Sequence, residues 1–186
     1  MIVLIIMETK RLYLRELDLT DIEALSRVLS DPESMQYYPE PFSRERVEKW
    51  IQWNINNYEK YNHGLWAVIL RDGEKFIGDC GITMQIIENE IVPEIGFHII
   101  KDYWNKGYAT EAALACKEYA FRILNYPKVF SYTTVKNIPS QKVAEKIGMQ
   151  EYKIFEKNGE KQIAQVAFNT DGSVNVRETG LKPFRV

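Results

Sequence analysis

A strand, a glycine-containing turn and a helix follow one another directly in this chain, and this order constrains the fold more than any other feature. Residues 94–100 contain β-branched and aromatic side chains, which predict a strand. The turn at 104–110 contains Gly107, and apolar residues at helical spacing continue from Ala113 to Leu124. A helix that begins here presents N–H groups without intrahelical acceptors at the positive end of its dipole. The segment therefore indicates an anion-binding site, although Gly107 would equally suit an ordinary tight turn.

Two common phosphate-binding motifs do not account for this turn. The GxxxxGK[ST] pattern of a P-loop does not occur in the sequence. A dinucleotide fingerprint would need a third glycine and an acidic residue after a second parallel strand, and both are missing. Any anion is therefore expected to bind mainly through backbone groups at the start of the helix.

Patterns typical of strands and helices surround this segment. Thr20–Glu23 fits a capping box, and Ser43 is placed to cap a second helix. Three successive β segments up to Ile100 suggest an antiparallel meander. We expect helices at 20–29, 43–61 and 139–147, and strands at 12–17, 65–70, 76–84, 91–100, 129–135 and 152–168, the last being a hairpin around Asn158–Gly159.

Length and composition indicate one domain spanning residues 1–186, with enough apolar side chains (45%) for a substantial core. The 24 basic and 26 acidic residues give a net charge of −2, which argues against nucleic acid as a partner. Cys80 and Cys116 are too few for a disulfide framework, so both are expected to be small buried hydrophobes in a reducing cytoplasm.

The two ends of the chain are the least informative parts of the sequence. The apolar stretch Met1–Met7 is far shorter than the about 20 residues that span a bilayer, so neither a membrane helix nor a signal peptide is predicted. Residues 1–6 are interpreted either as an added start or as an extra edge strand. The segment 169–186, with a turn signal at Asp171–Gly172, is a C-terminal extension of unclear role.

Two motifs, in this order, resemble those of a known family. Trp104-x-x-Gly107-x-Ala109-x-Glu111-Ala112 is similar to the pyrophosphate-binding motif of the GCN5-related N-acetyltransferases, in the variant of the ribosomal-protein N-terminal acetyltransferase branch. The family usually has Gln or Arg where this chain has Trp104, a departure that is common in that branch. Asn137-x-x-Ser140 followed by Gly148-Met149 resembles the second family motif. The resemblance covers roughly residues 7–155.

The resemblance implies the acyl-CoA N-acyltransferase fold, an α+β architecture of three α/β/α layers with a mixed, strongly twisted sheet of about seven strands. It also implies acetyl-CoA as cosubstrate and no metal, in keeping with the absence of any metal-ligand spacing among the cysteines and histidines. The residues that the resemblance assigns to the donor are Phe97, His98, Ile99, Trp104, Asn105, Lys106, Gly107, Tyr108, Ala109, Thr110, Asn137 and Ser140.

Acetyl transfer to an amine needs a base, a hydrogen-bond donor for the oxyanion and a proton for the departing thiolate. Glu94 is the candidate base if burial raises its pKa, the alternative being a solvated carboxylate at a strand end. The N–H of Phe97 or of His98 is the candidate oxyanion donor. Many relatives carry a tyrosine acid where this chain has Ala144. Ser140 is therefore the candidate acid, the alternative being a hydroxyl that bonds the backbone of its own helix.

Aromatic residues between the first two predicted helices occupy the segment that forms one wall of the acceptor site in this family. Tyr37 and Tyr38 are the candidate acceptor contacts. Trp50 and Trp53 have helical spacing, which favours a place in the core. His98 is expected to be packed or hydrogen-bonded rather than catalytic.

The leading functional hypothesis is an N-acetyltransferase that acts on a peptide or protein N-terminal α-amine by direct attack in a ternary complex. We expect a cytoplasmic monomer or homodimer. One alternative is an N-acetyltransferase of small amines, such as polyamines, amino acids or antibiotics, and another is a non-catalytic, regulatory CoA-binding module. The choice of acceptor rests on the Asn137-x-x-Ser140 resemblance alone, because fold and donor do not determine it.

Overall fold

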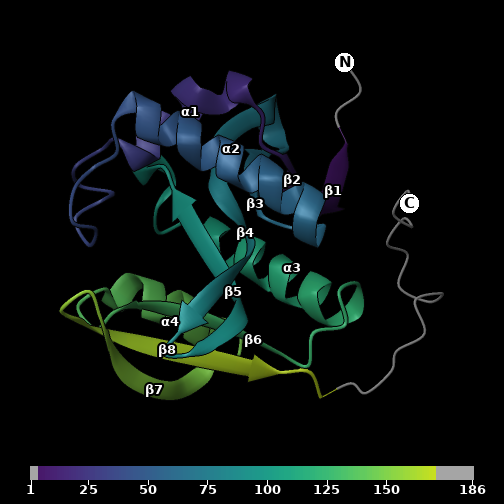
Figure 1. Ribbon diagram of the computed structural model, residues 1–186. Helices are drawn as coiled ribbons and strands as arrows, with labels where there is room; N and C mark the ends of the chain where they lie inside the picture. The colour runs from purple at the N-terminus through teal and green to yellow at the C-terminus, as the bar shows by residue number, and fades with distance from the viewer. Residues whose placement is uncertain (1–3, 171–186) are drawn as a thin grey trace.

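The computed structural model describes residues 4–170, which form one mixed sheet with helices on both faces (Figure 1). The α-helices are α1 (Ile22–Leu29), α2 (Arg44–Tyr61), α3 (Tyr108–Arg122) and α4 (Ile138–Lys146). The strands are β1 (Ile5–Glu8), β2 (Leu12–Glu16), β3 (Leu65–Leu70), β4 (Lys75–Ile87), β5 (Glu90–Ile99), β6 (Lys128–Thr134), β7 (Gln150–Lys157) and β8 (Glu160–Phe168). Their order across the sheet is β1-β2-β3-β4-β5-β6-β8-β7.

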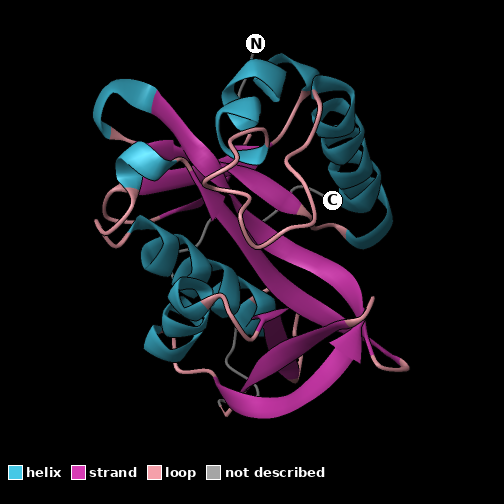
Figure 2. Ribbon diagram, turned by 90° about the vertical axis from the view of Figure 1, so that its left-hand side faces the viewer, coloured by secondary structure: helices cyan, strands magenta, loops and turns pink. Residues whose placement is uncertain are grey.

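Helices lie on both faces of the sheet (Figure 2), and a separate hydrophobic core holds them to each face. On one face, Leu25 of α1 and Ile51 of α2 pack with Ala67 of β3. On the other face, Cys116 of α3 packs with Val68 of β3. Since successive strand residues point to opposite faces, the neighbours Ala67 and Val68 serve the two cores. The predicted three-layer arrangement is therefore confirmed.

The sheet opens between β5 and β6. These strands are parallel and pair at a single position, Glu94 with Phe130, whereas β4 and β5 pair from Gly78–Ile99 to Ile87–Glu90. Beyond Glu94, residues 95–99 have no strand partner on that edge among the described residues. In Figure 1, β5 runs away from β6 and β8 toward α1. The edge of β5 past Glu94 is therefore free to bind another extended chain.

The structure refines one prediction and corrects another. The described part of the sheet has eight strands, in keeping with the about seven predicted, and residues 5–8 form the edge strand β1, which pairs with β2. The first helical segment is capped by Asp18 rather than Thr20, because a short turn at Leu19–Asp21 precedes α1. The Asp18 carboxylate accepts from the Thr20 N–H, and the Asp21 carboxylate accepts from the Asp18 N–H.

Predictions for three single residues are confirmed, and one prediction falls outside the described part of the chain. Ser43 caps α2, and Cys80 and Cys116 are free and fully buried, all as predicted. Residues 1–3 and 171–186 lie outside the described residues, and with them the predicted turn at Asp171–Gly172.

We predict that Gly81→Ala destabilises the fold, because a Cβ at residue 81 would lie 2.0 Å from the Gly64 carbonyl oxygen, a backbone atom with no freedom to move aside. The expected loss in free energy of unfolding is about 1–3 kcal/mol, the usual cost of overpacking. Urea denaturation monitored by circular dichroism measures it. Gly159→Ala is the control, since its Cβ would meet nothing within 4 Å and only the positive φ of 78° opposes it. A loss at Gly81 no larger than that at Gly159 would contradict this packing constraint.

Candidate active site

Glu94, Gly96 and His98 lie on the same face of β5, the face covered by α1 and α2, because side chains alternate along a strand. Gly96 pairs with Gly81 of β4, so no side chain stands between the carboxylate and the imidazole. A Cβ on Gly96 would lie 3.4 Å from Glu94 Oε2, which shows that the carboxylate leans over the glycine. Leu65 Cδ2 would lie 3.5 Å from the same Cβ, so the Leu65 side chain also packs beside this backbone. The stretch from Glu94 to His98, here called the Gly96 strip, has an acidic group at one end and an imidazole at the other.

The Glu94 carboxylate is buried, with 8% of the residue exposed. Burial raises the pKa of Glu94 to about 7, and the Tyr132 backbone, His98, Lys157 and Thr83 oppose this rise. Near neutral pH the carboxyl group therefore exists in both protonation states, which a general base requires. The alternative of a solvated carboxylate at a strand end does not fit this burial.

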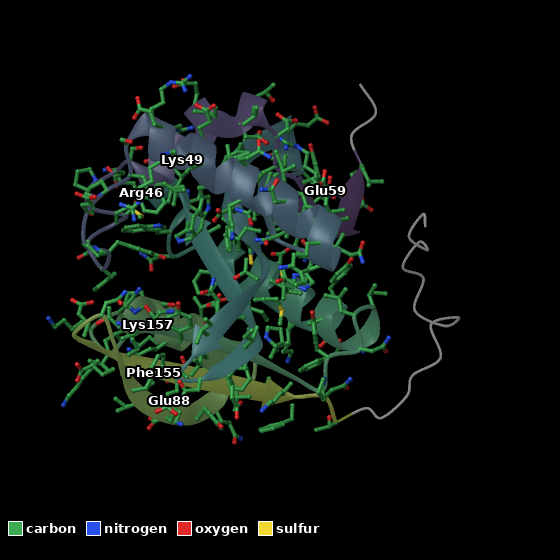
Figure 3. The ribbon with its side chains drawn as sticks, in the orientation of Figure 1. Arg46, Lys49, Glu59, Glu88, Phe155 and Lys157 are labelled. Carbon is green, nitrogen blue, oxygen red and sulfur yellow. The ribbon has the colours of Figure 1, made fainter. Side chains whose placement is uncertain are left out.

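Tyr132 and Lys157 lie beyond Glu94, on the far side of the opening. The Lys157 ammonium donates to the Tyr132 hydroxyl (2.7 Å) and lies 4.5 Å from the centroid of its ring. Figure 3 shows Lys157 on the half of the molecule that contains β7 and β8, below the part of α2 that carries Arg46. The opening is thus bordered by α2 and its preceding loop on one side and by β6–β8 on the other.

A hydrogen-bonded chain joins four side chains beside the opening. His98 Nδ1 lies 2.7 Å from Asp79 Oδ1, and His98 Nε2 lies 2.7 Å from the Tyr38 hydroxyl. The indole N–H of Trp50 donates to Asp79 Oδ2 (3.2 Å). Burial alone would lower the pKa of His98, but Tyr38 and Asp79 outweigh it and raise that pKa above its usual value. His98 is thus hydrogen-bonded, as predicted.

Two members of this hydrogen-bonded chain, and two aromatic residues beside it, can be compared with their sequence-based predictions. Trp50 is half-buried, packs against the α1–α2 core and also borders the opening. Trp53 is half-buried beside it, with ring centroids 5.2 Å apart. Asp79 was not singled out, but its position opposite His98 follows once Gly81 and Gly96 are paired across the meander. Tyr37 is half-buried next to Tyr38.

The turn before α3 has the backbone geometry of an anion site. Asn105 (φ 58°) and Gly107 (φ 80°) are both left-handed, and Gly107 occupies the N-cap without any side-chain cap. The first N–H groups of α3, at Tyr108–Thr110, therefore lack intrahelical acceptors and point outward at the positive end of the helix dipole. These groups fit the phosphates of a coenzyme A, which would approach the backbone closely at Gly107.

Arg11, in the connection between β1 and β2, bonds to this turn and holds it in place. The sequence did not predict this role. Its Nη1 donates to the Lys106 carbonyl (2.9 Å), and its Nε donates to Glu111 Oε2 (2.6 Å). Its guanidinium also lies 4.4 Å from the centre of the Tyr108 ring. Glu111 additionally accepts from the Thr9 hydroxyl (2.6 Å), so its carboxylate ties the first turn of α3 to the β1–β2 connection.

The backbone groups of β5 divide between its two edges. Ile100 N–H donates to the Ile77 carbonyl, so the groups of His98 face β4 and those of Phe97 and Ile99 face the open edge. The indole N–H of Trp104 donates to the Ile99 carbonyl (2.6 Å), which occupies that acceptor. The Phe97 N–H is thus a donor on the open edge, three residues from Glu94.

Asn137 and Ser140 lie at the start of α4, across the opening from β5. Asn137 Oδ1 accepts from the Ser140 N–H (3.2 Å), and Asn137 Nδ2 donates to the Thr133 hydroxyl (3.1 Å). The Asn137 side chain thus caps the N-terminus of α4. Ala144, one turn further on, is buried, so α4 offers no tyrosine hydroxyl at that position.

Searches for other site types gave no candidates. Within residues 4–170, no group of three or more His, Cys, Asp or Glu side chains could hold a metal ion. No α-helix in that range is long and apolar enough to cross a membrane.

Comparisons with known proteins agree with this geometry. Residues 11–150 match the family model of the acetyltransferase (GNAT) domain. The chain is 38% identical over 151 residues to the uncharacterized N-acetyltransferase YnaD of Bacillus subtilis, covering 80% of this chain and 85% of YnaD.

Solved structures share the fold along most of the chain. A GNAT-family acetyltransferase from Bacillus anthracis superposes with a TM-score of 0.76 at 26% identity, over 88% of this chain and 98% of that one. RimL, a ribosomal L7/L12 α-N-protein acetyltransferase solved with coenzyme A, superposes with a TM-score of 0.73 at 20% identity, over 90% and 99%.

We predict that Gly107→Glu abolishes binding of acetyl-CoA, because a carboxylate in the turn would repel the phosphates and block close approach of the backbone. Isothermal titration calorimetry measures the Kd. Gly159→Glu is the matched control, since residue 159 has a similar φ (78° against 80°) and open space around it. A folded Gly107→Glu variant that binds within threefold of wild type, about 0.7 kcal/mol, would place the phosphates elsewhere.

Proposed function

This chain belongs to the GNAT acetyltransferase family and is an N-acetyltransferase, and we propose that its acceptor is the α-amino group of a peptide or protein N-terminus. The observation that carries the proposal is the buried Glu94 carboxylate, which leans over Gly96 at the point where β5 and β6 separate. A base at that place serves an amine that enters from the α1–α2 side.

The donor is acetyl-CoA, the cosubstrate of this family, and it supplies the thioester that the amine attacks. The N–H groups of Tyr108–Thr110 and the turn at 104–107 bind its phosphates, while the open edge at 97–99 binds its amide-bearing arm. Asn137 lies across the opening, where it lines the path of that arm. Arg11 acts indirectly, by holding the carbonyl of Lys106 and the first turn of α3.

Three groups divide the proton and charge chemistry in this proposal. Glu94 takes a proton from the attacking amine, directly or through a water molecule. The Phe97 N–H stabilises the oxyanion, and the alternation of backbone groups favours it over the His98 N–H, which faces β4. Ser140 donates a proton toward the departing thiolate from the start of α4.

Two kinds of observation support a peptide acceptor, one from the family resemblance and one from the structure. Asn137-x-x-Ser140 follows the ribosomal-protein branch, and the structural relative RimL acts on the α-amine of a ribosomal protein. The loop that carries Tyr37 and Tyr38 borders the opening, and Tyr38 is 41% exposed, which leaves its hydroxyl accessible to an incoming chain.

We predict that Glu94→Gln lowers kcat by about 10²-fold near pH 7.5 and by much less at pH 9. The loss shrinks because an α-amine with a pKa of about 7.7–8.0 is already neutral at pH 9 and no longer needs a base. In the wild type, a Glu94 pKa of about 7 means that activity rises as pH increases through 7.

Steady-state rates between pH 6.5 and 9 check this profile. Glu90→Gln, an exposed residue of the same strand, is the control for charge removal and should match wild type. Ser140→Ala should lose activity to a similar extent at every pH, since its proton goes to the thiolate. A Glu94→Gln loss that is equal at pH 7 and pH 9 would mean that Glu94 positions the acceptor instead.

An acceptor panel tests the function itself. Mass spectrometry should detect acetylation of peptide α-amines in a panel that also contains polyamines, amino acids and aminoglycosides. Acetylation confined to the small amines would overturn the peptide proposal in favour of a small-molecule N-acetyltransferase. Binding of acetyl-CoA without transfer to any member would favour a regulatory binding module.

A further inference from the structure

The contacts among Tyr38, His98 and Asp79 bear on how the acceptor is selected. The inference drawn from them rests on the proposed peptide function. We infer that the Asp79–His98 pair positions the Tyr38 hydroxyl as a hydrogen-bond donor toward the acceptor, so that the preferred acceptor carries a carbonyl oxygen close to its amine. The first peptide unit of a protein N-terminus has this chemistry. An aliphatic polyamine has no such oxygen.

The Asp79 carboxylate is completely buried (0% exposed). Its hydrogen-bond partners are the Trp50 indole at 3.2 Å and His98 Nδ1 at 2.7 Å, and the imidazole is the partner that can carry a positive charge. A buried carboxylate is stable only beside a cation or a strong set of donors, so Asp79 favours the imidazolium form of His98. Nδ1 of His98 then donates to Asp79, and Nε2 also carries a proton.

The direction of the next hydrogen bond follows from this charge. His98 Nε2 lies 2.7 Å from the Tyr38 oxygen, and a protonated Nε2 has no lone pair, so it donates and the hydroxyl oxygen accepts. The hydroxyl hydrogen of Tyr38 is then free for a partner in the opening. If His98 were neutral, the Tyr38 hydroxyl would donate to Nε2 and could not donate to an acceptor.

The acceptor's amine and oxygen would bind at opposite ends of the Gly96 strip. Glu94 and His98 are four residues apart on one face, so their Cα atoms lie about 13 Å apart along the strand. The Glu94 carboxylate leans over Gly96, and Tyr38 reaches His98 from the loop before α2, which shortens the span between the two polar ends. A short chain segment with an amine at one end and a carbonyl nearby suits this arrangement.

The charged and titratable groups around His98 come from several elements. Asp79 lies on β4, Tyr38 lies on the loop before α2, and Glu94 lies on β5 itself. Tyr132 of β6 and Lys157 of β7 lie further away, next to Glu94. Asp79 and Tyr38 make the direct contacts with the imidazole, which makes His98 a positioning residue and Tyr38 the group that touches the acceptor.

Two matched peptides test the inference. One is a tripeptide with a free α-amine, and the other is the same tripeptide with its first peptide unit, C(=O)–NH, replaced by trans CH=CH, which keeps the shape and removes the carbonyl oxygen together with the N–H. We expect the wild type to prefer the natural tripeptide by about tenfold in kcat/KM, the scale of one lost hydrogen bond. Tyr38→Phe should remove this preference, mainly by raising the KM for the natural tripeptide to that for the alkene peptide.

His98→Ala should also remove the preference, while His98→Gln, whose amide N–H can still donate to the Tyr38 oxygen, should retain part of it. Tyr152→Phe, an exposed tyrosine of β7, is the control and should match wild type. Thermal denaturation verifies that each variant is folded.

The outcomes separate the two proposals. If the wild type acetylates both peptides equally, or if Tyr38→Phe slows both by the same factor, Tyr38 serves only to hold the loop and the inference is wrong, although the peptide function stands. If the wild type acetylates neither peptide but does acetylate polyamines, the proposed function fails and the inference fails with it.

Discussion

The separation of β5 from β6 is the constraint on which the rest of this structure depends. The two strands pair only at Glu94–Phe130, and past that point β5 has backbone groups but no strand neighbour among the described residues. A sheet that closed here would bury those groups in a ladder and leave no place for an extended donor. Because the strands are parallel, the chain must cross over between them, and α3 makes that crossover. The start of α3 therefore follows the end of β5, where its free N–H groups continue the row of open backbone groups that we propose as the donor site.

Polar side chains flank a glycine pair on this face of the sheet. Gly81 and Gly96 face each other across β4 and β5, and the flanking positions on β5 hold Glu94 and His98. Burial raises the pKa of Glu94, whereas the pairing with Asp79 and Tyr38 raises that of His98. One group is thereby suited to accept a proton near pH 7 and the other to remain charged.

Local sequence patterns predicted the helix positions and the turn at Gly107, because each depends on neighbouring residues, whereas the three layers were implied by the family resemblance. Ser43, for example, caps the helix that its spacing predicts. Contacts between distant segments were not predicted: Arg11 and Glu111 are 100 residues apart, and Tyr38 and His98 are 60 apart. No local pattern reports such contacts, since they form only when the loops are brought together by the sheet. His98 was accordingly identified as hydrogen-bonded, but its partners were not.

The central claim is that the open edge of β5 holds the donor through its backbone. Amide hydrogen exchange measured by NMR, with and without saturating acetyl-CoA, tests it at single residues. The Phe97 N–H faces the open edge and should exchange more slowly when the donor is bound, whereas the His98 N–H faces β4 and should exchange at the same slow rate in both states. Equal exchange of the Phe97 amide with and without bound donor would contradict the account.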